Sequence, residues 1–169
     1  MITRPAAFRV YGEPAPKGSM IPRKLKGGRV VVVEDNKRTK PWRRAIEKAA
    51  PVHITERADK WQPVALHLVF AVTRLPAQHD VTRPVKRATG GVGGDLDKMV
   101  RLVLDALESC RVLTDDAQVT EIHAQKMFAE SPDWSGRPGV PGVYCRIEPV
   151  GWVPDELPYE DTLDDTERH

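Results

Sequence analysis

The sequence predicts an α+β fold, with a small mixed sheet and two main helices in a single domain. Strand-like segments occur near the start, in the middle and near the end of the chain, and two segments with helical spacing separate them. The chain has 169 residues and is 40% hydrophobic, which is enough to form one core. The predicted order of elements is β, β, α, β, α, β, β, without internal repeats.

The first part of the chain combines short strands with a basic segment. Residues 8–12 alternate apolar and polar side chains, and the Pro- and Gly-rich residues 12–18 cannot continue that strand. The β-branched residues 30–33 predict a second short strand. Basic residues around two glycines precede it and indicate a basic hairpin or loop: Arg23, Lys24, Lys26 and Arg29.

The first helix is predicted over residues 41–50. Pro41 suits the first position of a helix, and one apolar stripe follows it, formed by Trp42, Ala45, Ile46 and Ala49. A central strand over residues 61–72 comes next. It leads into the basic, glycine-ending loop 74–94. Long irregular connections are usually functional or disordered, and we interpret this one as functional because acidic residues follow it directly.

The second helix is predicted over residues 97–108, where no Pro or Gly interrupts the helical spacing. Its core stripe would be Leu96, Val100, Val103 and Leu107. Two strands follow, at residues 119–127 and 142–150.

The charge of the chain is unevenly distributed. We predict a domain over residues 1–153 and an acidic, disordered tail over residues 154–169. Of the chain's 26 basic and 24 acidic residues, residues 155–169 hold one arginine and seven acids, which leaves 25 basic against 17 acidic residues and a net charge of +8. That balance suits a polyanionic partner, although many soluble domains are as basic without binding nucleic acid.

Several classes of protein do not fit this sequence. The longest apolar run, residues 64–72, is far shorter than the roughly 18–20 residues that cross a bilayer, and the amino terminus lacks a secretory signal. We therefore expect a protein without a membrane span that stays in the cytoplasm. The two cysteines, Cys110 and Cys145, form neither a CxxC motif nor a zinc-ligand pattern.

Four carboxylates at two chain positions are candidates for binding a metal ion. Asp95 and Asp97 are two residues apart in a turn, so both side chains could reach one cation, and Asp115 and Asp116 follow after the second helix. Helix capping and turn formation would also explain aspartates at these places. Oxygen ligands favour Mg²⁺ or Mn²⁺, and a calcium EF-hand is excluded because Met99 and Val100 occupy the places of its fifth and sixth loop residues.

This segment resembles the RusA family of Holliday junction resolvases, which are small and often phage-encoded. Residues 94–107 contain the pattern D-x-D, a basic residue four places later and D-A-L, and residues 113–119 contain D-D-x-Q-V. The similarity extends through Glu121 and Lys126, and residues 14–18 look like the opening loop of that family. It implies a Mg²⁺-dependent endodeoxyribonuclease of recombination and repair, acting as a homodimer on branched DNA in the host cytoplasm.

The resemblance also implies roles for individual residues. Asp95, Asp97 and Asp116 would bind Mg²⁺ or Mn²⁺, Asp115 would position the turn, and Asp105 would orient Arg101. Arg101 stands where the family usually has lysine; it stays charged, so it would stabilise the phosphate or transition state and not transfer a proton. The residues expected to contact DNA phosphates are Lys17, Arg23, Lys24, Arg87 and Lys98.

Two alternatives remain at this stage. One is a non-catalytic module that binds branched DNA and uses Mg²⁺ only to hold the acidic residues together. The other is a nuclease that acts on flaps or forks instead of four-way junctions. The retained aspartates favour a nuclease, whereas the arginine at position 101 weakly favours a binding module.

Overall fold

The computed structural model describes residues 1–18, 20–34, 36–75, 94–134 and 136–151. Most of the predicted basic loop, including Arg87, and the predicted acidic tail lie outside these residues. The described elements are, in chain order, β1 (Ala6–Tyr11), β2 (Met20–Lys24), β3 (Val30–Glu34), α1 (Thr39–His53), β4 (Val64–Val72), α2 (Leu96–Ser109), the short 3₁₀ helix η2 (Asp116–Gln118), β5 (Val119–Phe128) and β6 (Gly142–Pro149).

The main sheet is mixed, as predicted. Its four strands lie in the order β1-β6-β4-β5. Strand β6 is antiparallel to both β1 and β4, whereas β4 and β5 run parallel. Two parallel neighbours need a crossover between them, and α2 provides it. This crossover places the two ends of α2 over opposite ends of the sheet, which matters for the site described below.

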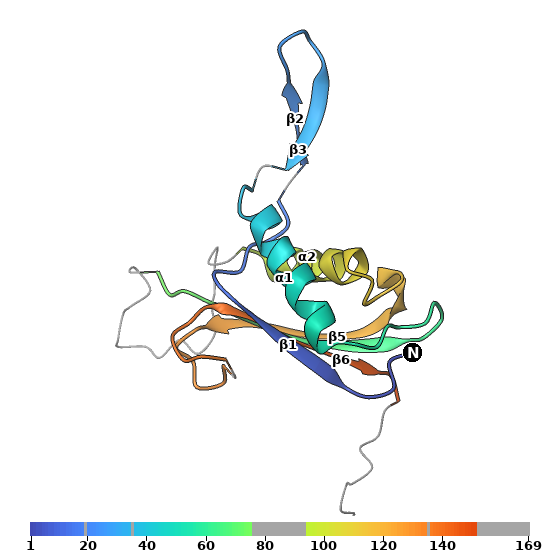
Figure 1. Ribbon diagram of the computed structural model, residues 1–169. Helices are drawn as coiled ribbons and strands as arrows, with labels where there is room; N and C mark the ends of the chain where they lie inside the picture. Colours follow the sequence, from blue (N-terminus) through green and yellow to red (C-terminus); the bar gives the residue numbers. More distant parts are fainter. Residues whose placement is uncertain (19, 35, 76–93, 135, 152–169) are drawn as a thin grey trace, which may run out of the picture.

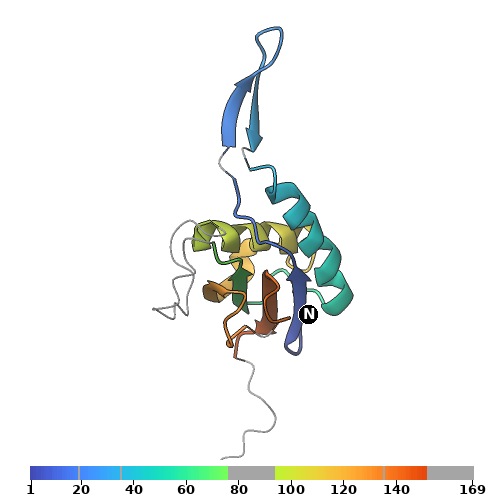
Figure 2. The ribbon, with the colours of Figure 1, turned by 90° about the vertical axis from the view of Figure 1, so that its left-hand side faces the viewer.

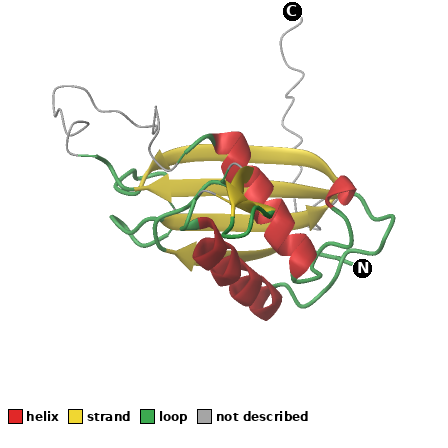
Figure 3. Ribbon diagram, turned by 90° about the horizontal axis from the view of Figure 1, so that it is seen from above, coloured by secondary structure: helices red, strands yellow, loops and turns green. Residues whose placement is uncertain are grey.

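Both helices cover the same face of this sheet (Figure 1 and Figure 3). Helix α1 buries Trp42, Ile46 and Ala50 against it, and β4 supplies large central core residues such as Leu66 and Phe70. The core face of α2 is formed by Met99, Leu102, Val103, Ala106 and Leu107.

The predicted core stripes need correction. Leu96 and Val100 on α2, and Ala45 and Ala49 on α1, are only partly buried and flank the core. The fully buried face of α2 is rotated toward Met99, Leu102 and Ala106, because α2 packs against α1 as well as against the sheet.

The observed starts of one helix and one strand also differ from the predicted ones. Helix α1 begins at Thr39, so Pro41 stands at its third residue, where its missing N–H still costs no helical hydrogen bond. Strand β4 begins at Val64 and not at Trp61. The Gln62 N–H donates to the Asp59 carbonyl oxygen at 2.9 Å to form a turn, and Pro63 has no N–H to donate to a neighbouring strand.

The basic segment forms a separate hairpin that projects from the body of the molecule (Figure 1 and Figure 2). Strands β2 and β3 pair only with each other, which adds one strand to the predicted order. Gly27 and Gly28 close the hairpin with φ values of +99° and +82°, which residues with side chains rarely adopt. Among the described residues, no helix is long and apolar enough to cross a membrane.

Candidate functional site

The first acidic position is the turn that leads into α2. Asp95 is the residue before the helix and has an extended backbone, with φ −73° and ψ 139°. Its side chain makes no capping hydrogen bond, so the capping explanation for this aspartate is not realised. The carboxylate is 67% exposed, and its Oδ2 atom lies 3.3 Å from Lys98 Nζ. Asp97 follows in the first turn of α2 and is also exposed.

Three residues from two other parts of the chain hold this turn. Gly94 has a φ of +89° and lies against Pro16: a Cβ atom on Gly94 would lie 2.5 Å from Pro16 Cγ. The Nζ atom of Lys126, on β5, donates a hydrogen bond to the Gly94 carbonyl oxygen at 2.8 Å. The Lys17 N–H donates to the Lys98 carbonyl oxygen at 3.1 Å. The backbone that carries Asp95 and Asp97 is therefore fixed from outside the helix.

The exposed face of α2 continues from Asp97 to Arg101 and Asp105. Arg101 is exposed, and Asp105 is partly buried. Asp105 was expected to orient Arg101, but the contact that the structure gives it is an ion pair with Lys17, with Nζ 2.6 Å from Oδ2. This ion pair also engages a lysine that the sequence assigned to DNA phosphates. It joins the loop of residues 14–18 to the middle of α2.

The second acidic position is the turn of Asp115 and Asp116, before β5. Asp115 Oδ1 accepts a hydrogen bond from the Ala117 N–H at 2.9 Å, and Gln118 Oε1 accepts from the Asp115 N–H at 3.1 Å. This reciprocal arrangement is a capping box, so Asp115 stabilises the turn. Asp116 is exposed at the first residue of η2.

Gln118 ties this turn to the segment that precedes β4. Its side chain is buried, and its Nε2 atom donates to the carbonyl oxygens of Asp59 and Gln62. The Thr114 hydroxyl donates to the Ala58 carbonyl oxygen at 3.2 Å. The sequence contained Gln118 within a motif but did not indicate this role, because its partners are more than 50 residues away in the chain.

The two acidic positions lie at opposite ends of α2 within one chain. Helix α2 has 14 residues, and at 1.5 Å per residue such a helix is about 21 Å long. Lys126, near the end of β5, contacts Gly94 at the start of α2, whereas Asp116 precedes the first residue of β5. Figure 1 shows α2 lying along the sheet between these two ends. Within the described part of one chain, no three His, Cys, Asp or Glu side chains are arranged to hold a metal ion.

The residues expected to bind DNA fall into three groups. Arg23 and Lys24 are exposed on β2 of the projecting hairpin, and Lys26 and Arg29 extend the same basic surface around its turn. Lys17 and Lys98 lie beside the Asp95 turn, in ion pairs with Asp105 and Asp95. Arg87 lies outside the described residues.

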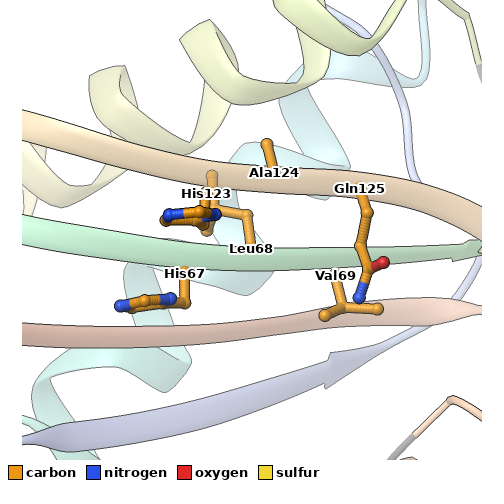
Figure 4. A pocket seen from close by; sticks show the side chains of 6 residues that line it. All are labelled: His67, Leu68, Val69, His123, Ala124 and Gln125. Atoms are coloured by element: carbon orange, nitrogen blue, oxygen red, sulfur yellow. The ribbon is translucent and has the colours of Figure 1, made fainter.

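The sheet face opposite the helices carries a polar cluster that the sequence did not indicate. The rings of His67 on β4 and His123 on β5 stack with their centroids 5.4 Å apart and line a shallow pocket with Gln125 (Figure 4). His67 Nε2 lies 2.8 Å from Glu148 Oε1 on β6, and Glu148 also pairs with Arg146. No sequence signal could reveal this cluster, since it depends on the pairing of His67 with His123 across parallel strands.

The two thiols play no part in either acidic position. Cys145 is fully buried in the core, and burial raises the pKa of its thiol above the ordinary value. Burial also raises the pKa of the half-buried Cys110 thiol. Neither cysteine is disulfide-bonded.

Comparison with known proteins matches the part of the chain that contains both acidic positions. The protein-family model described as Endodeoxyribonuclease RusA matches residues 12–139, which include the projecting hairpin, both helices and both acidic turns. A search of curated proteins found no match to the chain.

Proposed function

Because the chain belongs to the RusA endodeoxyribonuclease family, we propose that it resolves Holliday junctions by Mg²⁺-dependent hydrolysis of phosphodiester bonds, as a homodimer. The membership makes the chain an endodeoxyribonuclease. The junction substrate, the metal ion, the dimer and the residue roles are the content of the proposal.

The observation that carries the proposal is the separation of the acidic residues along α2. Asp95 and Asp97 offer carboxylate oxygens at one end of the helix and Asp116 offers one at the other, and all three are exposed. Mg²⁺ is usually held by one or two carboxylates together with waters and substrate phosphate oxygens, so Asp95 and Asp97 could begin a site and an Asp116 carboxylate would complete the proposed set of three. In a symmetric dimer, Asp95 and Asp97 of one copy can meet Asp116 of the other, and the symmetry produces two equal centres.

These donors fit a hard divalent cation. All the donor atoms are carboxylate oxygens, and the Asp95 carboxylate makes no helix-capping hydrogen bond. The Asp95 turn is held in position by Pro16, Lys17 and Lys126. When bound there, the metal ion would supply an activated water and offset charge on the scissile phosphate. Asp95, Asp97 and Asp116 would hold it, and Asp115 keeps Asp116 in place through the capping box.

Arg101 would bind the scissile phosphate. It lies one helical turn after Asp97 on the exposed face of α2, and its guanidinium keeps its charge throughout the physiological pH range. It would therefore neutralise charge that develops on the phosphate and would not act as a base. Lys98, which pairs with Asp95, is the second cation at this end of the helix.

The projecting hairpin would hold the junction arms. Arg23 and Lys24, with Lys26 and Arg29 at its turn, form a basic surface away from the main sheet. Contacts of this kind bind phosphates and carry no sequence information, so selectivity for branched DNA would depend on shape.

The experiment that tests the proposal is cleavage of synthetic four-way, flap and linear duplex DNA with and without Mg²⁺. We expect paired nicks in the four-way junction only with Mg²⁺, and loss of cleavage in Asp97→Asn. Preferential cleavage of flaps would redirect the substrate assignment. Binding of the junction without cleavage of any DNA would favour the non-catalytic module, and equal activity in Asp97→Asn would overturn the metal site.

A further inference from the structure

We propose that Trp61 and the pocket beside it bind a nucleobase of the DNA substrate, next to the acidic turn of Asp115 and Asp116. This inference rests on the proposed function, since it assigns the contact that distinguishes branched DNA from continuous duplex.

Trp61 is unusually exposed for its size. The whole residue is 84% exposed, although tryptophan is normally buried for most of its surface. The ring is not part of either apolar cluster of the fold. Lys60 Nζ lies 4.9 Å from the centre of the ring and adds a positive charge at the same place. An exposed aromatic ring beside a cation is the arrangement that proteins use to stack on bases while contacting the phosphate chain.

The pocket next to Trp61 has the composition of a base-binding site. Its volume is about 340 Å³, which is at the lower end of the range for small-molecule sites. Trp61 and Pro63 give it an apolar side. Thr114, Asp115 and Thr120 also line it, and their side-chain oxygens could accept hydrogen bonds from the edge of a base.

The pocket is held in shape before any DNA arrives. The buried Gln118 side chain joins the turn before β5 to the segment that carries Trp61. Gln62 is also bonded to both backbone groups of Ile2, accepting from its N–H at 2.8 Å and donating to its carbonyl oxygen at 2.5 Å. Trp61 is therefore presented from an ordered segment, which reduces the entropy lost when a base stacks on it.

The location connects this pocket to the acidic turn. Asp115 and Ala117, the two neighbours of Asp116 in the chain, both line it. DNA bound across this turn would bring a base within reach of the Trp61 ring. In continuous duplex both faces of each base are already stacked, whereas a branch point exposes a base face at little cost. The stack would therefore favour branched DNA.

The test is equilibrium binding in EDTA, where no cleavage occurs, with a four-way junction and a linear duplex of the same sequence. Each carries 2-aminopurine at the branch point or the matching position. We expect Trp61→Ala to weaken junction binding by at least about fivefold, within the range for loss of one base–aromatic stack, and to abolish the quenching of 2-aminopurine. Binding to linear duplex should be unchanged.

Two control variants make the result specific. Trp61→Phe keeps a smaller aromatic ring and should retain most of the junction affinity. Val52→Ala removes another exposed apolar side chain, on α1, and should bind like the wild type. Unaltered junction binding by Trp61→Ala, or an equal loss for junction and duplex, would overturn the base contact. A wild type that shows the stacking signal but cuts no DNA would overturn the proposed function and leave the base contact standing.

Discussion

The Nζ atom of Lys126 lies 2.8 Å from the carbonyl oxygen of Gly94, so a lysine from the end of β5 holds the backbone immediately before Asp95. The same backbone lies against Pro16 on its other side. This hydrogen bond links Lys126 to the site through the position of the Asp95 turn.

We expect Lys126→Met to weaken Mn²⁺ binding by about 10- to 100-fold, the usual effect of removing a group that positions a metal ligand. Methionine keeps the apolar part of the side chain but cannot donate the hydrogen bond. Isothermal titration with Mn²⁺ measures the change, and Lys126→Arg should restore part of it. The matched control is Gln125→Ala, whose exposed side chain lies on the opposite face of the sheet. Wild-type affinity in Lys126→Met would show that Pro16 and Lys17 fix the turn without the Lys126 hydrogen bond.

Mixed dimers should reveal whether the acidic residues of two copies form one centre. In a dimer of an Asp97→Asn chain with an Asp116→Asn chain, a shared arrangement leaves one centre with both native aspartates. We therefore expect each variant to be inactive alone and the co-refolded mixture to nick one strand of a four-way junction. If each centre came from a single chain, every centre in the mixture would carry one substitution. An inactive mixture that still forms dimers would contradict the shared arrangement.

Arg101 should act through its charge. We expect Arg101→Ala to lower the cleavage rate by about 100-fold or more, as when one stabilising donor is lost from a transition state. Arg101→Lys should keep most of the activity, and the pH dependence should be the same as in the wild type, since neither residue would serve as the base. Single-turnover cleavage rates provide the measurement. Arg44→Ala, an exposed arginine on α1, is the control. Full activity in Arg101→Ala would remove the assignment.

The hairpin should bind phosphates without regard to sequence. The double substitution Arg23→Ala and Lys24→Ala should weaken binding to junctions of unrelated sequence by the same factor. It should also lower the slope of log affinity against log salt by about two, because each phosphate contact to duplex contributes about 0.9. Binding isotherms between low and moderate salt measure this slope. Lys48→Ala, on α1, should leave the slope unchanged.

Local patterns predicted most of the fold. Both helices and the strands of the main sheet were predicted within a few residues, because helical spacing and strand alternation are properties of short segments. The error at Pro41 arose because proline is tolerated throughout the first turn of a helix and does not fix its first residue. The error at Trp61 arose because a turn hydrogen bond delays the start of the strand. The exact face of α2 was less predictable, since its burial depends on α1 and the sheet together.

The candidate site was predictable in its residue types but not in its geometry. The spacing around Asp95 and Asp116 indicated which acidic residues belong to the site. It did not indicate that these two residues lie at opposite ends of α2, because that separation follows from the parallel pairing of β4 with β5, which are far apart in the chain. The same reason hid the Lys17–Asp105 ion pair and the contact of Lys126 with Gly94. Contacts between distant segments follow from the packed fold, and residue spacing alone does not contain them.

The parallel direction of β5 beside β4 has a consequence for how much enzyme a cell needs. If β5 ran the other way, Asp116 would return to the Asp95 end of α2 and one chain could hold the metal alone. With the strand in its present direction, the proposed centre exists only after two copies associate, so specific activity should rise with protein concentration up to the dissociation constant of the dimer. Dilution would then switch off DNA cleavage without any inhibitor, and the level of synthesis would set the threshold at which DNA is cleaved.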